Sequence, residues 1–406
     1  MITSSGTIIN GLIGLFFYIL IARYLGPSQF GIFSVATTTI ALLSSISNIG
    51  IDTGIVRFVG KYISSQKDKA LRFLKLALRL KLYTSLAVLT LGWLIMPTVA
   101  VGILGKPELI SPLRLSLAGV GTALLFSFVT SSVQAIQRFW VWSGLNIFSN
   151  LLRLGAALIL FSLGIISVNT FLAIYIIFPL FGFFLGLLFL PKFWKIKKET
   201  EVLKEFFNYN KWVALFTLIA AFSSRLDTFI SAKLLTLSDV GIYSVAVSLS
   251  SIIPSIIFAL ATVIAPKLAS IRTDKEVYIY LKKLQLFVIG LAAMGIAVGI
   301  PISYHLIPVF YGKEYMASIA PLIILIVSQA IFLISVPVHT AVFYYFSYPK
   351  LFVYINLIYL LIVSILGYIL IGKFGYIGAA WTMLIGNITN FIIPFVWVVK
   401  KFKHVY

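Results

Sequence analysis

Charged side chains inside long apolar segments are the feature of this sequence best suited to chemistry. Arg153 lies about ten residues into the apolar run 144–164, or about 15 Å along a helix, which places it near the midplane of a bilayer. Arg225 and Asp227 lie past the middle of the apolar run 211–235. A charge at membrane depth is expensive, so a retained charge usually faces a cavity or a partner.

Arginines at such depth suit a phosphorylated ligand, because guanidinium groups are permanently charged and offer paired donors to phosphate oxygens. We expect Arg153 and Arg225, joined by Arg57 after the second apolar run, to line an electropositive cavity for a lipid diphosphate head group. The sequence leaves a second interpretation open, in which a neighbouring carboxylate or carbonyl neutralises each arginine. For Arg225 that carboxylate would be Asp227, although residues two positions apart on a helix point to different faces.

Several other kinds of chemistry are excluded by composition. The chain has no cysteine, which removes disulfides, thiolate metal sites and cysteine nucleophiles. His305, His339 and His404 lack metal-ligand spacing, so no metal site is expected. No glycine-rich loop ending in Lys-Ser or Lys-Thr is present, so ATP is not the direct drive. We therefore expect no catalytic residues and no cofactor.

The elements that must position these charges are transmembrane helices. The 406 residues are 61% hydrophobic and 11% charged, and the mean hydropathy is +1.07. A span needs about 20 apolar residues, and continuous runs favour helices over the alternating strands of a barrel. We predict an all-α integral membrane protein with about twelve transmembrane helices, near residues 7–24, 30–50, 80–104, 113–136, 144–164, 168–190, 211–235, 240–264, 284–309, 317–345, 351–372 and 376–399.

The distribution of basic residues predicts the orientation of these helices. Lys and Arg concentrate in the even-numbered loops and the C-terminal tail, and basic loops stay in the cytoplasm. We therefore expect a multi-pass protein of the cytoplasmic membrane with both termini cytoplasmic. This asymmetry and anionic lipid head groups account for the net charge of +21, so nucleic acid is not an expected partner. The odd-numbered loops carry only Arg23, Lys106, Arg114, Lys233, Lys313 and Lys373.

An internal repeat divides the chain into halves. Residues 22–36 and 232–246 are identical at eight of fifteen aligned positions, and Gly105-Lys106 recurs as Gly312-Lys313. We predict an N-terminal lobe of helices 1–6 (1–191), a basic cytoplasmic linker (192–210) and a C-terminal lobe of helices 7–12 (211–406). Six helices in each lobe make the repeat parallel, an arrangement in which a central cavity can open alternately to either side.

Four short motifs resemble a known family. They are Arg23-Tyr24-Leu25-Gly26-Pro27-Ser28-Gln29-Phe30-Gly31, Gly50-Ile51-Asp52 with Arg57, Tyr311-Gly312-Lys313-Glu314-Tyr315 and Gly375-Tyr376-Ile377-Gly378-Ala379-Ala380. Together they resemble the polysaccharide transporter, or O-antigen flippase-like, family of the multidrug/oligosaccharidyl-lipid/polysaccharide exporter superfamily. The resemblance covers nearly the whole chain.

The resemblance implies a flippase for surface polysaccharide or glycan biosynthesis, not an enzyme. Its cargo would be a polyprenyl-diphosphate oligosaccharide, and its partners would be membrane lipids and enzymes of polysaccharide assembly. Because relatives couple transport to ion gradients, Asp227 and Asp52 are candidates for ion coupling, although this chain has few intramembrane acids.

Two alternatives remain. A polytopic polysaccharide polymerase needs reactive groups outside the bilayer, and the outer loops offer only isolated acids, Glu108, Asp239 and Glu314. A cation-coupled drug or small-molecule exporter of the same superfamily would bind cations with a membrane-embedded acid. The deep groups here are mainly basic, which favours an anionic substrate.

Overall fold

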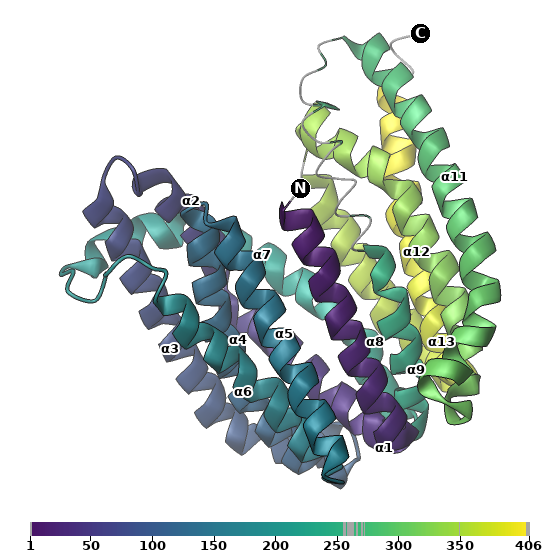
Figure 1. Cartoon of the computed structure of the whole chain (residues 1–406). Coiled ribbons are helices and arrows are strands. Elements are labelled where there is room, and N and C mark those ends of the chain that lie inside the picture. Colours follow the sequence, from purple (N-terminus) through teal and green to yellow (C-terminus); the bar gives the residue numbers. More distant parts are fainter. Residues whose placement is uncertain are drawn as a thin grey trace. The chain divides into compact units, whose positions relative to one another are not determined.

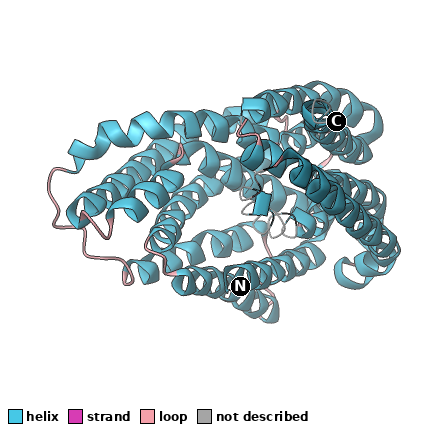
Figure 2. Ribbon diagram, turned by 90° about the horizontal axis from the view of Figure 1, so that it is seen from above, coloured by secondary structure: helices cyan, strands magenta, loops and turns pink. Residues whose placement is uncertain are grey.

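The computed structural model describes residues 2–254, 257, 264, 267–268, 271, 273–348 and 350–402, and these residues form helices and no strand (Figures 1 and 2). The α-helices are α1 (Ile2–Asn48), α2 (Ile51–Tyr62), α3 (Lys67–Pro97), α4 (Ile110–Ala135), α5 (Phe139–Ser162), α6 (Val168–Leu187), α7 (Leu203–Ser223), α8 (Leu226–Leu234), α9 (Leu237–Ser250), α11 (Asp274–Leu306), α12 (Ile319–Thr340) and α13 (Lys350–Phe402). Short π or 3-10 segments are η1 (Thr98–Ile103), η2 (Pro107–Leu109), η3 (Glu199–Val202), η4 (Ile307–Tyr311), η5 (Lys313–Ser318) and η6 (Ala341–Tyr345).

Two of the helices are each interrupted by a glycine. Gly26 in α1 has φ 71° and ψ 169°, and Gly375 in α13 has φ 62° and ψ −143°. Positive φ is strained for residues with a Cβ, so glycine is suited to both positions. Pro27 directly follows the first break, where its fixed φ suits the first position of a new helix. Each long helix therefore contains two of the expected spans.

Nine helices among the described residues are long and apolar enough to cross a membrane by length and composition. Because α1 and α13 each hold two spans, and α7 with α8 supplies another, they match the expected set of about twelve. The span expected over 211–235 is not continuous, however, and turns at Ser224 and Arg225. The hydroxyls of Ser223 and Ser224 donate to backbone carbonyls one turn back, at 2.8 and 3.1 Å, and such bonds bend helices.

The chain folds into two compact units. The N-terminal unit comprises residues 1–25 and 29–225, and the C-terminal unit comprises residues 26–28 and 226–406. In the N-terminal unit α4 packs against α3 and α6, and α7 packs against α2 (Figure 1). In the C-terminal unit α12 packs against α11 and α13. The N-terminal unit thus includes the expected linker 192–210 and α7, and a lobe boundary at that linker stays a prediction.

The sequence repeat is also a repeat of local structure. In the N-terminal unit α3 runs into the π segment η1, the chain turns at Gly105 with φ 68°, and the 3-10 segment η2 leads into α4. In the C-terminal unit α11 runs into the π segment η4, the chain turns at Gly312 with φ 99°, and η5 leads into α12. Similarly, the break at Gly26 corresponds in the aligned repeat to Thr236, the residue that caps α9.

The expected linker carries acids that bind α3. These acids and the basic residues that they contact form a row of ion pairs, which we call the α3 zipper. It comprises Lys69–Glu205 at 2.8 Å, Arg72–Glu201, Lys75–Glu199 at 3.6 Å and Arg79–Glu199. The hydroxyl of Tyr62 in α2 also donates to Glu205 at 2.8 Å. The linker is therefore docked against the N-terminal unit.

Candidate functional site

A cavity of about 300 Å³ lies within the N-terminal unit among α1, α4, α5 and α6. It contains Arg153, the arginine that the sequence places deepest in an apolar run. The other lining residues are Asn10, Ile40, Ala41 and Ser44 of α1, Gly119, Thr122, Ala123 and Phe126 of α4, Asn146, Ser149 and Asn150 of α5, and Tyr175 and Pro179 of α6. Eight of these fourteen residues carry polar side chains, although the helices around the cavity are apolar.

Arg153 is held at the cavity by oxygen atoms and an aromatic ring. Its Nη1 donates to Asn150 Oδ1 and its Nη2 to the Tyr175 carbonyl, both at 3.0 Å, and its guanidinium lies 4.2 Å from the Tyr175 ring centroid. The carbonyl is available because Pro179, four residues later in α6, has no N–H to donate to it. Asn150 in turn donates to Asn10 Oδ1 of α1 at 2.7 Å. A helix proline therefore creates the acceptor that positions the arginine.

Three polar atoms at the cavity are left without a partner. Arg153 Nε and the hydroxyls of Ser44 and Ser149 are buried, and none has a hydrogen-bond partner among the described residues. Buried polar groups are nearly always paired in proteins, because an unmade hydrogen bond costs the desolvation of the group. No ion pair joins Arg153 to a carboxylate in the described part of the chain. The wall of the cavity therefore contains a positive charge that no described carboxylate neutralises, and three buried hydrogen-bonding groups that the described residues leave unmet.

The other two arginines expected at the site lie elsewhere. Arg57 is exposed on α2, with its guanidinium 4.2 Å from the ring centroid of Tyr209 in α7. Arg225 is exposed in the turn that separates α7 from α8. Neither residue lines the Arg153 cavity. The expected cluster of three arginines is therefore not assembled at this cavity, because α2 and the α7–α8 turn do not contribute to its wall.

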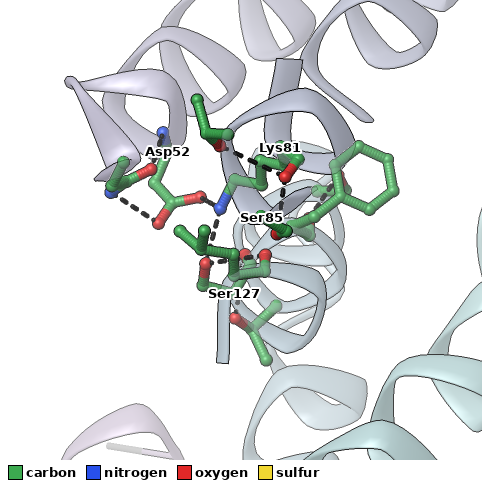
Figure 3. Close-up of polar contacts among 10 residues, drawn as sticks. Asp52, Lys81, Ser85 and Ser127 are labelled. Atoms are coloured by element: carbon green, nitrogen blue, oxygen red, sulfur yellow. Dashed lines mark hydrogen bonds and ion pairs between the residues drawn. The ribbon is translucent and has the colours of Figure 1, made fainter. Parts of the chain in front are cut away.

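Asp52 belongs to a buried ion pair that sequence reasoning missed. Lys81 of α3 is fully buried, and its Nζ lies 2.5 Å from both Asp52 Oδ1 and Ser127 Oγ (Figure 3). Asn48 donates to the other carboxylate oxygen of Asp52 at 2.9 Å. The available signal was the place of Lys81 at the very start of the predicted span 80–104, where its side chain could turn inward.

Asp227 is a buried acid of the C-terminal unit. It lies on α8 and accepts a hydrogen bond from the Tyr243 hydroxyl of α9 at 2.7 Å. One turn later on α8, the buried hydroxyl of Ser231 has no hydrogen-bond partner among the described residues. In α12, His339 Nε2 lies 2.9 Å from the Asn390 carbonyl, a contact between helices. In the described ranges no three His, Cys, Asp or Glu side chains are grouped so as to hold a metal ion.

Solved structures with a similar fold include a flippase and several transporters. The chain is similar to the lipid II flippase MurJ in an inward closed conformation, with a TM-score of 0.78 and 18% identity over 98% of this chain and 87% of that one. It is also similar to an inward-facing multidrug resistance MATE transporter of the MOP superfamily, with a TM-score of 0.74 and 15% identity over 97% and 95% of the two chains. A MOP superfamily transporter from Pyrococcus furiosus, described as having a binding pocket of reverse polarity, gives a TM-score of 0.65 and 15% identity over 98% and 94%.

These likenesses confirm the predicted fold, an all-α multi-pass membrane protein with about twelve transmembrane helices. No curated protein matches the chain in sequence. The family model described as polysaccharide biosynthesis protein matches residues 20–320. That segment contains the Asp52–Lys81 pair, Asp227 and every lining residue of the Arg153 cavity except Asn10. The match confirms the resemblance read from the motifs, and the chain belongs to the polysaccharide biosynthesis protein family.

Proposed function

We propose that this protein is a flippase that carries a polyprenyl-diphosphate oligosaccharide across the cytoplasmic membrane by alternating access, without catalysis. The observation that carries the proposal is Arg153, a guanidinium deep in an apolar helix that lines a cavity and forms no ion pair with a carboxylate among the described residues. Membership of the polysaccharide biosynthesis protein family and a fold shared with a lipid II flippase support it.

The electrostatics of the cavity favour an anionic cargo. A guanidinium stays charged in proteins, and the desolvation that it suffers in a membrane is offset when an anion binds it. Phosphate oxygens accept charge-assisted hydrogen bonds, which are about twice as strong as neutral ones. Asn150 and Tyr175 each accept one N–H from the two terminal nitrogens of Arg153, and each of these nitrogens has a second N–H to offer a phosphate. We therefore assign a phosphate of the diphosphate to Arg153.

Arg57 and Arg225 take a different part in the proposal. Both are exposed, and Arg57 rests on the ring of Tyr209. Exposed arginines suit the capture and release of a charged head group, because they remain hydrated until the ligand arrives. We propose that they contact the substrate before it enters, or after it leaves, the Arg153 cavity.

In the proposed orientation both termini lie in the cytoplasm. The proposed partners are the enzymes of polysaccharide assembly. The chain has no native cysteine, so single cysteines can be placed without background. In intact cells, a cysteine at Lys401 should resist an impermeant thiol reagent, and a cysteine at Lys106 should react with it. The opposite pattern of labelling would reverse the proposed orientation.

The function is tested by translocation of a fluorescent polyprenyl-diphosphate oligosaccharide in proteoliposomes. The wild-type protein should translocate the lipid, Arg153→Ala should abolish translocation, and Arg225→Ala should reduce it. Arg114→Ala is a matched control, because Arg114 lies over the Trp93 ring and outside the cavity. A wild-type protein that leaves the lipid in its original leaflet would refute the proposal.

A cation-coupled exporter of the same superfamily is a second candidate, and the buried carboxylate of Asp227 is the observation that favours it. In that case export of a cationic dye should depend on Asp227, and Asp227→Asn should stop it. If the lipid is translocated instead, Asp227 is a candidate for ion coupling of the flippase, and so is Asp52. Lipid translocation that depends on a sodium or proton gradient in the wild type, but not in Asp227→Asn, would assign the coupling to Asp227.

A further inference from the structure

A backbone carbonyl released by a proline occurs in both units. In the second half of α13, Pro394 has no N–H to donate to the carbonyl of Asn390, four residues earlier. That carbonyl oxygen lies 2.9 Å from Nε2 of His339 in α12. In the N-terminal unit the carbonyl of Tyr175 is released in the same way and accepts from Arg153. The contact in the C-terminal unit differs in one respect, because a histidine side chain gains and loses its charge near neutral pH.

The contact with Asn390 fixes the tautomer of the neutral His339 ring. A carbonyl oxygen only accepts, so Nε2 of His339 must carry the hydrogen. The other ring nitrogen, Nδ1, lies 3.5 Å from the hydroxyl of Ser335, which is longer than an ordinary hydrogen bond. That hydroxyl donates its own hydrogen to the Phe332 carbonyl at 2.6 Å. In the described part of the chain Nδ1 therefore receives no donated hydrogen, and it is the nitrogen that can bind a proton.

The surroundings of the imidazole disfavour a positive charge in this conformation. The rings of Phe352 and Phe332 lie 5.0 and 6.1 Å from it between centroids, and no carboxylate is ion-paired to it among the described residues. Two titratable side chains, Tyr280 of α11 and Tyr345 of η6, pack against the same apolar cluster as Phe352, and Tyr345 bonds Asp274. The charged residues at this end of α11 and α13 are the acids Asp274 and Glu276 and the lysines Lys275, Lys282, Lys283, Lys350, Lys400 and Lys401.

We propose that His339 is a proton-binding site, and that the proton releases α12 from the second half of α13. The neutral ring joins the two helices through Nε2 and the Asn390 carbonyl. A proton on Nδ1 charges the ring, and a charged ring is stable only where water can hydrate it. A hydrated imidazole takes up a proton between about pH 5 and pH 8. Because the separated arrangement of the helices binds the proton more tightly than the packed one, acid favours separation.

Two irregularities beside His339 allow this end of α12 to move. Pro337, two residues earlier, interrupts the hydrogen bonds of the helix, and the π segment η6 begins directly after Thr340. His339 is partly exposed and lies about 9 Å along the helix from the end of η6. In the proposed orientation this end is cytoplasmic, so the proton comes from the cytoplasm. The inference rests on the proposed flippase function in this respect, since it makes transport depend on the cytoplasmic pH.

Spin labels on the full-length protein test the separation directly. The chain has no native cysteine, so labels can be placed on cysteines at Tyr344 of η6 and Val396 of α13, both exposed. The distance between them should be short at pH 8 and longer at pH 5.5. His339→Gln keeps an N–H for the Asn390 carbonyl but takes up no proton in this range, so it should keep the short distance at both values. An equal response to pH in His339→Gln and the wild type would overturn the inference.

Two further variants separate the proton from the fold. His305→Gln is the matched control, because His305 is an exposed histidine at the opposite end of α11, and it should respond to pH as the wild type does. Pro394→Ala restores an N–H that can bond the Asn390 carbonyl within α13, so the helices should already lie apart at pH 8. A short distance in Pro394→Ala at pH 8 would show that the carbonyl does not hold His339.

The same variants in the translocation assay distinguish this inference from the proposed function. Translocation of the polyprenyl-diphosphate oligosaccharide should change several-fold between pH 8 and pH 5.5 in the wild type and stay level in His339→Gln. Lipid translocation with the same pH profile in both proteins would overturn the inference and leave the flippase function intact. A distance that responds to pH through His339, in a protein that fails to translocate the lipid, would instead overturn the proposed function.

Discussion

Lys81 and Asp52 form an ion pair in the interior of the N-terminal unit, with 2.5 Å between Lys81 Nζ and Asp52 Oδ1 (Figure 3). The lysine side chain is 0% exposed and that of the aspartate is 24% exposed. The pair joins α2 to α3, and Ser127 joins it to α4. A charge so deeply buried depends on its partner, because water cannot replace the carboxylate.

Replacing Asp52 and replacing Lys81 should therefore destabilise the folded protein by different amounts. Asp52→Asn leaves the buried ammonium uncompensated and should lower the free energy of unfolding by about 3–5 kcal/mol. Lys81→Met leaves a carboxylate that still reaches solvent and Asn48, and should cost less. The double variant should be more stable than Asp52→Asn alone, because it carries no unpaired buried charge. Thermal unfolding of the purified protein in detergent measures all three.

Lys197→Met is the control for the loss of a lysine, because Lys197 is exposed in the linker. It should unfold at the wild-type temperature. Equal unfolding temperatures for Asp52→Asn and the double variant would show that the ammonium does not need the carboxylate.

The apolar runs predicted the helices well, because a span is defined by consecutive apolar residues and does not depend on distant parts of the chain. Arg153 was likewise found from its depth in a run. What the sequence could not show depends on contacts between segments far apart. The interior position of Lys81 depends on Asp52, 29 residues earlier, and the docking of the linker depends on acids such as Glu205 reaching α3. The role of Pro179 became visible only when the Tyr175 carbonyl was seen to face Arg153.

The α3 zipper should weaken at low pH. A hydrogen bond from its own backbone N–H lowers the pKa of Glu199, and Arg79 and Lys75 lower it further against the opposing effect of burial. A carboxyl whose pKa is lowered by folding stabilises the folded state above its unfolded pKa, about 4.3 for glutamate, and loses that contribution as the pH falls through the folded value. The linker should therefore stay docked at pH 7 and loosen below about pH 4.3.

Spin labels on single cysteines introduced at Lys67 and Lys197, both exposed, report this docking through the distance between them. The distribution of distances should be narrow at pH 7 and broaden in acid or in high salt, which screens exposed ion pairs. Glu199→Gln should broaden it already at pH 7, whereas Glu108→Gln, outside the zipper, should not. An unchanged distribution in Glu199→Gln would mean that apolar packing alone docks the linker.

The break at Gly375 should not tolerate a side chain. Its φ of 62° is unfavourable for an L-residue, although a Cβ there would meet no atom within 4 Å. Gly375→Ala should therefore lower the free energy of unfolding by about 1–2 kcal/mol through backbone strain alone. Gly372→Ala is the control, since Gly372 also has open space for a Cβ but has no positive φ. It should be neutral or slightly stabilising, and equal thermal unfolding of the two variants would contradict the role assigned to the break.

Pro179 has no N–H, so the Tyr175 carbonyl one turn earlier is left to accept a hydrogen bond from Arg153. Pro179→Ala restores an N–H that can bond this carbonyl within α6, so the helix should become more regular and the protein no less stable. Arg153 would lose one of its anchors, and its guanidinium would be less well placed for a phosphate. We expect lipid translocation to fall several-fold, with a larger effect on the apparent KM than on the maximal rate.

Pro301→Ala is the matched control, because Pro301 is an exposed proline inside α11 and far in sequence from the cavity. It should leave translocation unchanged. A Pro179→Ala protein that is equally stable and translocates the lipid at the wild-type rate would show that Asn150 and the Tyr175 ring hold Arg153 without the carbonyl. A loss of translocation matched by a loss of stability would instead point to damage in the packing of α6, so both measurements are made on the same preparation. Only the combination of retained stability and impaired translocation supports a proline that acts through the arginine.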